Sequence, residues 1–88
     1  MKKITDLKFR EVIHCETKEE ATAICILMDR AGLRWKSKEK YTSNNQWKFY
    51  KEDTCYHPKG NSYSDVEFYK EEGYKIYPAS DFLGLVKQ

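Results

Sequence analysis

The chain has no long hydrophobic run. Its longest apolar stretch, Ala23–Met28, falls far short of the roughly 20 apolar residues that a membrane-spanning helix requires. Residues 1–8 carry lysines but are not followed by the apolar segment of a secretory signal. The sequence therefore predicts a cytoplasmic protein with no membrane contact.

The spacings of common metal and catalytic sites are also missing. Cys15, Cys25 and Cys55 are odd in number and widely separated, which predicts free thiols in a reducing compartment. No Cys-x-x-Cys pair accompanies His14 or His57, as a zinc site would require. Cys55 and His57 share one face of a predicted strand, but no glycine-rich phosphate loop is present. We expect no enzymatic activity, no metal and no cofactor.

Net charge is small as well. Sixteen Lys and Arg residues stand against 14 Asp and Glu residues, for a formal charge of +2. This balance argues against nucleic acid as the partner, because such binding usually depends on a strongly basic face. The 88 residues predict a single domain, 1–88, with residues 1–7 as the candidate for a loose N-terminal arm. A core this small favours self-association, so a homo-oligomer is expected.

Local patterns predict an α+β fold: a small twisted sheet of about four short strands, with one long amphipathic helix and one short helix. The long helix, 18–31, is the clearest element, since Thr17 and Glu20 form a capping box before it and Gly32 suits its C-cap. A second capping box at Ser64 predicts the short helix. The predicted strands are 9–15, 33–37, 53–57 and 74–78. Residues 38–46 read as a polar loop, 47–50 stay open between strand and helix, and Ser80 begins a helical turn.

Aromatic residues are abundant in one part of the chain. Twelve of the 13 lie between Trp35 and Phe82, more than one small core needs. Rings mixed with lysines suit a surface that stacks on a flat ligand or on a protein. The structural alternative is that Trp35, Phe49, Tyr56, Phe68 and Ile76 form the core beneath the long helix. The candidate pocket rings are Trp35, Tyr41, Trp47, Tyr50 and Tyr56, with Arg34 and Lys36 as phosphate contacts and His57 as a polar one.

Three segments carry a family resemblance: Val12–Cys15 before the capped helix, Gly32–Trp35 after it, and Tyr50–Tyr56. With these segments the chain resembles, over residues 11–83, short proteins encoded by phages and prophages of Firmicutes. The resemblance implies a non-enzymatic inhibitor of bacterial immunity that acts in the cytoplasm of the host cell. The preferred mechanism is sequestration of a nucleotide-derived immune signal. The alternatives are a protein-binding inhibitor of a defence enzyme or CRISPR effector, and a phage accessory protein that binds nucleic acid.

Overall fold

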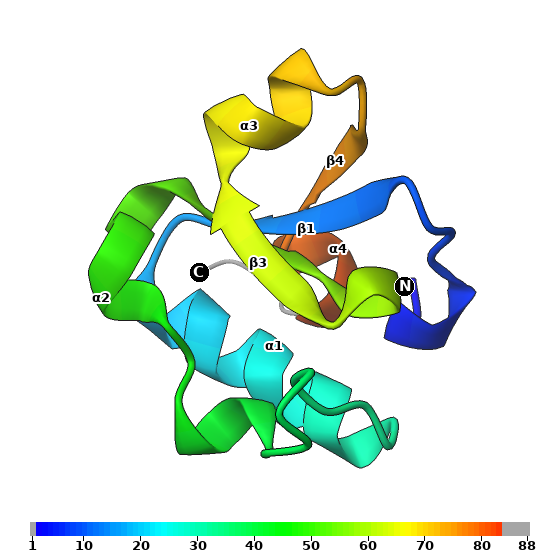
Figure 1. Cartoon of the computed structure of the whole chain (residues 1–88), viewed down its shortest axis with the longest axis vertical. Helices are drawn as coiled ribbons and strands as arrows, with labels where there is room; N and C mark the ends of the chain where they lie inside the picture. Colours follow the sequence, from blue (N-terminus) through cyan, green and yellow to red (C-terminus); the bar gives the residue numbers. More distant parts are fainter. Residues whose placement is uncertain (1, 84–88) are drawn as a thin grey trace.

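A computed structural model describes residues 2–83 (Figure 1). The strands are β1 (Glu11–Cys15), β2 (Thr54–His57), β3 (Ser62–Asp65) and β4 (Lys75–Pro78). The helices are α1 (Lys18–Arg30), α2 (Trp47–Tyr50), α3 (Val66–Glu71) and α4 (Ser80–Leu83). Four single 3-10 turns complete the elements: η1 (Ile4–Asp6), η2 (Tyr41–Ser43), η3 (Lys51–Asp53) and η4 (Pro58–Gly60). No helix within residues 2–83 is long and apolar enough to cross a membrane.

The four strands form one mixed sheet in the order β3-β2-β1-β4. β2 pairs antiparallel with both β1 and β3, whereas β4 pairs parallel with β1. Across the sheet, Ile13 lies opposite Tyr56 on one side and opposite Tyr77 on the other. The predicted α+β fold with a small sheet of about four strands is confirmed.

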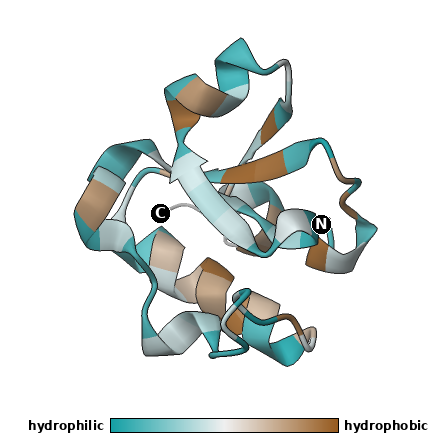
Figure 2. Ribbon diagram, in the orientation of Figure 1, coloured by the Kyte–Doolittle hydropathy of each residue, from teal (hydrophilic) through white to brown (hydrophobic). Residues whose placement is uncertain are grey.

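Helices cover the two faces of the sheet unequally. α1 lies on one side and the short α3 on the other (Figure 1). Since side chains alternate along a strand, Ile13 and Cys15 of β1 enter the larger core beneath α1, while Val12 packs with Val66 and Tyr69. Figure 2 shows that hydrophobic residues occur along both β1 and α1. The larger core also takes in much of the chain that connects α1 to β2.

α1 begins where its sequence predicts and ends at Arg30, one residue before the predicted end. The Thr17 hydroxyl accepts a hydrogen bond from the Glu20 amide at 3.0 Å, and the Glu20 carboxylate accepts one from the Glu16 amide at 2.9 Å. Gly32 follows with a φ of 83°, the left-handed conformation that glycine adopts without strain. The helix spans 13 residues.

The predicted strand at 33–37 is wrong. The Trp35 amide donates to the Glu39 carbonyl at 3.0 Å, and the Lys38 amide donates back to the Trp35 carbonyl at 2.7 Å, so this segment closes on itself as a turn. Lys38 has a φ of 76°, which is incompatible with a strand. The fourth strand is instead β3, at the edge of the sheet beside β2.

Two further boundaries differ from the prediction. Ser64 belongs to β3, and Asp65 caps α3 by accepting the Phe68 amide at 3.0 Å. The N-terminal segment is packed down, since Ile4 and Leu7 are buried in the larger core and the Lys2 amide donates to the Asp81 carbonyl at 2.9 Å. Residues 2–7 are thus part of the domain and do not form a loose arm.

Candidate functional site

Three of the five candidate pocket rings lie in the core. The Trp35 ring centroid is 4.2 Å from that of Tyr41 and 6.3 Å from that of Tyr56. Tyr41 and Tyr56 are fully buried, and Trp35 is 8% exposed. These rings pack on one another and on Cys25 and Met28 of α1, so they stack with the protein's own side chains. The structure thus places these three candidate rings inside the core, whereas the sequence analysis expected them to line a pocket.

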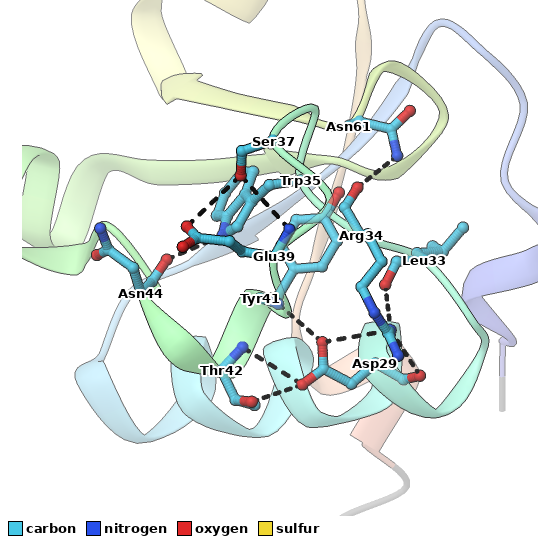
Figure 3. A network of polar contacts seen from close by, with 10 residues as sticks. All are labelled: Asp29, Leu33, Arg34, Trp35, Ser37, Glu39, Tyr41, Thr42, Asn44 and Asn61. Carbon is cyan, nitrogen blue, oxygen red and sulfur yellow. Dashed lines mark hydrogen bonds and ion pairs between the residues drawn. The ribbon is translucent and has the colours of Figure 1, made fainter.

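Arg34 is engaged within the fold. Its guanidinium donates to the Leu33 carbonyl at 2.6 Å and to the Asp29 carbonyl at 3.3 Å, and lies 4.0 Å from the Asp29 carboxylate. The same carboxylate accepts the Tyr41 amide at 2.8 Å and the Thr42 hydroxyl at 2.6 Å (Figure 3). Arg34 therefore helps to fix the connection after α1, whereas Lys36 is exposed on the turn beyond it.

Further hydrogen bonds hold the same connection, one within it and two to the sheet side. The Trp35 indole donates to the Asn44 carbonyl at 3.0 Å, and the Asn61 amide side chain donates to the Arg34 carbonyl at 2.6 Å (Figure 3). The Tyr56 hydroxyl donates to the Asn45 carbonyl. Residues 33–46 form no strand, but most of these hydrogen bonds join residues that are distant in sequence, and they hold the segment in place.

His57 has a structural environment as well. It is 5% exposed, and its Nε2 donates to the Phe9 carbonyl at 2.5 Å. Its ring meets Phe9 and Tyr74 edge-on, with centroids 4.8 and 5.2 Å away. Gly60 leaves room for the ring, since a Cβ there would lie 2.6 Å from His57 Nδ1. The predicted ligand contact at His57 is thus directed into the fold.

The cysteines have no reactive setting. All three are buried and free, as predicted. Burial raises the pKa of Cys25 and of Cys55 to about 12, and it also raises the pKa of Cys15. Within residues 2–83, no group of three or more His, Cys, Asp or Glu side chains is placed to bind a metal ion.

Four aromatic rings of the described chain are exposed. Phe49 and Tyr50 are neighbours on α2, whereas Phe9 precedes β1 and Phe68 lies on α3. Phe49 is 58% exposed and Tyr50 is 37% exposed. The Tyr50 ring lies 5.7 Å from that of Tyr63 on β3, and Trp47 and Tyr63 both pack partly against the larger core. We call Phe49, Tyr50 and Tyr63 the α2 aromatic face, with Trp47 as its anchor. Large exposed rings beside side chains that pack against the core are typical of protein interaction sites.

The backbone on both sides of α2 is strained. Gln46 precedes the helix with a φ of 62°, and Lys51 follows it with φ 50° and ψ −122°. Such conformations cost a non-glycine residue on the order of 1–3 kcal/mol and persist only where the surroundings enforce them. Part of that enforcement is the Asn45 side chain, which accepts the Trp47 amide at 3.0 Å. These two residues separate α2 from its neighbours in the chain; Phe49 and Tyr50 of this helix are exposed, while Trp47 packs partly against the larger core.

No family model, curated protein or solved structure matches this chain. Its candidate site is therefore defined by geometry alone. Among the hollows on the described surface, four measure about 200–490 Å³, and none of these four is lined by a residue of the α2 aromatic face.

The structural alternative to the pocket placed Phe49 and Phe68 in the core beneath the long helix. Both are exposed, Phe68 by 46%, so that alternative is wrong for these two residues. A four-residue helix carries no periodicity from which a buried face can be read. The only signal was position: Phe49 follows the polar run Asn44–Gln46 and neighbours Tyr50.

Proposed function

We propose that this protein is a non-catalytic inhibitor that binds another protein through the α2 aromatic face. The observation that carries the proposal is the exposure of Phe49 and Tyr50 on a short helix held between two strained residues. Aromatic side chains of this kind dominate the binding energy of protein interfaces because they bury much area at little entropic cost.

The likeness to phage and prophage proteins supports a partner in bacterial immunity, namely a defence enzyme or a CRISPR effector of the host. Inhibition then needs no chemistry, since occupying a functional surface of the target is enough. The site of action is the cytoplasm of the infected cell.

Sequestration of a nucleotide signal is the competing mechanism for the same face. A sequestering site normally buries most of its ligand in a concave pocket. The rings expected to line that pocket, Tyr41 and Tyr56, are enclosed by the fold, and no described hollow borders Tyr50. These observations favour a protein partner.

The decisive test measures protection of an infecting phage. Cells carrying single defence systems are infected with and without the protein, and the target found in this way is purified for binding measurements. F49A and Y50A should each weaken binding by about 1–2 kcal/mol, roughly five- to thirtyfold, because each removes a candidate hot-spot ring. F68A is the matched control, since it removes an exposed ring of α3 outside the face.

Three results would count against the proposal. Loss of protection in F68A equal to that in F49A would show that the face is not special. A rise in melting temperature with nucleotide signals, abolished by Y50A, would favour sequestration. Light scattering tests the expected self-association: a dimer that dissociates in F49A would assign the face to a second copy of the chain.

A further inference from the structure

A second surface feature lies where the N-terminal segment, blue in Figure 1, turns back beside the start of β1. A hollow of about 370 Å³ opens there between this segment and the first residues of β1 and β4. Its size is at the lower end of the range for small-molecule sites. Its lining is Lys2, Lys3, Asp6, Leu7, Lys8, Glu11, Lys75 and Tyr77.

The charge of this hollow is unbalanced. Four lysines and two carboxylates line it, which gives a net charge of +2, as much as the entire chain carries. Among the described residues, ion pairs join only Arg34 with Asp29 and Lys70 with Glu67. None of the four lysines around the hollow has a carboxylate of residues 2–83 within ion-pair distance.

Two of these ammonium groups lie over the aromatic ring of Tyr77. The Nζ of Lys2 lies 4.5 Å from the centroid of its ring, and the Nζ of Lys75 lies 5.2 Å from it. The attraction of the ring for cations offsets part of the repulsion between them. Two positive charges are held over one ring at the edge of a hollow.

Glu11 is fixed by hydrogen bonds within the fold, and its negative charge offsets part of the positive charge of Lys8 and Lys75. Its Oε1 accepts the Lys8 amide at 2.8 Å, and its Oε2 accepts the Tyr77 hydroxyl at 3.3 Å. The carboxylate thereby fixes the Tyr77 ring and the backbone of Lys8 in place. It shapes the hollow while its two oxygens face hydrogen-bond donors of the protein.

We propose that this hollow binds a small anion with two or more phosphate charges, of the diphosphate class. Several ammonium groups around one small space suit a compact, multiply charged anion better than a single carboxylate. A nucleic acid strand would need basic residues extending beyond the hollow. Arg10, which immediately precedes β1, stacks over Tyr74 and donates to the Glu72 carbonyl.

The test is calorimetric titration with inorganic pyrophosphate and with a nucleoside diphosphate at low ionic strength, where exposed charges are least screened. Saturable binding of either at one site per chain is expected. Tighter binding of pyrophosphate would identify the free anion as the source, and tighter binding of the nucleotide would identify the nucleoside-bearing form. Amide resonances of residues 2–8 and 75–77 should shift on addition of the ligand.

Two triple variants of equal charge locate the site. K2Q/K8Q/K75Q should weaken binding roughly tenfold, since each exposed charge contact contributes roughly a factor of 1.5 to 5. K36Q/K38Q/K40Q removes as much charge from the turn after α1 and should bind nearly as the unmodified chain does. It also tests the phosphate contact that the sequence predicts at Lys36.

Several outcomes would overturn the assignment. Absence of saturable binding would do so, as would equal weakening in the two triple variants, which would indicate general electrostatics. Loss confined to K36Q/K38Q/K40Q would place the anion at the turn. Affinity for single-stranded oligonucleotides that rises with their length would replace a small anion by a nucleic acid strand.

Discussion

Asp29 offers the sharpest test of how the fold holds its irregular half. Its carboxylate accepts the Tyr41 amide, the Thr42 amide at 3.3 Å and the Thr42 hydroxyl, and it lies beside the Arg34 guanidinium. Hydrogen bonds to a charged group are worth about 1.5–3 kcal/mol each, but bonds sharing one carboxylate do not add. We expect D29A to lower the free energy of unfolding by about 3 kcal/mol, a large share of the roughly 5–15 kcal/mol typical of domains.

Urea unfolding followed by tryptophan fluorescence suits this measurement, because Trp35 packs 4.2 Å from the ring of Tyr41 and should report loosening of the connection. D53A is the matched control, since Asp53 is exposed and its removal should change stability by no more than about 0.5 kcal/mol. D29N keeps one acceptor oxygen but loses the charge, and should cost about 1 kcal/mol. A D29A variant no less stable than D53A would refute the reasoning.

The pH dependence gives a second check on Asp29. Burial opposes its ionisation, but the hydrogen bonds from Thr42 and Tyr41 outweigh burial, so the pKa of this carboxyl lies below its ordinary value. A depressed pKa in the folded state stabilises the protein above the unfolded pKa of about 3.9, and that contribution is lost as the pH falls through the folded value. The stability gap between the unmodified chain and D29N should thus be constant near neutral pH and close in acid. A gap that persists at the lowest pH at which both remain folded would contradict this.

Two further predictions concern the buried parts of the structure. G60A should destabilise by about 1–3 kcal/mol, because its Cβ would lie 2.6 Å from the ring of His57. G32A is the comparison: its Cβ meets no atom within 4 Å, and it should destabilise by about 1–2 kcal/mol through its φ of 83° alone. If the destabilisation by G60A vanishes when His57 is also truncated, its cause is steric; if the destabilisation is unchanged, that cause is excluded. The thiols should resist a disulfide reagent at pH 8 until the protein unfolds, since burial raises the pKa of Cys25 and Cys55 to about 12. Rapid modification of the native protein at that pH would show that the thiols are accessible.

Elements specified by neighbouring residues were predictable from sequence. α1 is the best example, since Thr17, Glu20 and Gly32 fix its ends through contacts within one turn. β1, β2 and β4 follow from β-branched and aromatic runs, and the structure places each within two residues of the predicted start. β3 could not be read in this way. Ser62–Asp65 pairs only with β2, and its serines and Asp65 also match the start of a helix.

The sequence did not allow us to predict which aromatic rings are buried in the core and which are exposed. Tyr41 and Tyr50 stand in similar polar surroundings along the chain, yet the first is fully buried and the second is 37% exposed. The difference is set by Asp29, which lies 12 positions before Tyr41 and draws its backbone toward α1. Tyr50 has no comparable hydrogen bond to α1. The residues next to Tyr41 and Tyr50 in the sequence do not reveal this difference.

The long connection between α1 and β2 explains why the chain has more aromatic residues than one small core needs. Residues 31–53 contain no strand, so their backbone lacks the hydrogen-bond ladder that would order it. One aromatic side chain placed in the core buries about 150–250 Å² of surface, and the free energy gained offsets the entropy lost when several residues of irregular chain become ordered. Trp35 and Tyr41 serve the connection in this way, and Trp47 does so in part. Phe49 and Tyr50 remain exposed on α2, so they take no part in this anchoring, and their exposure is the ground on which we propose a binding face there.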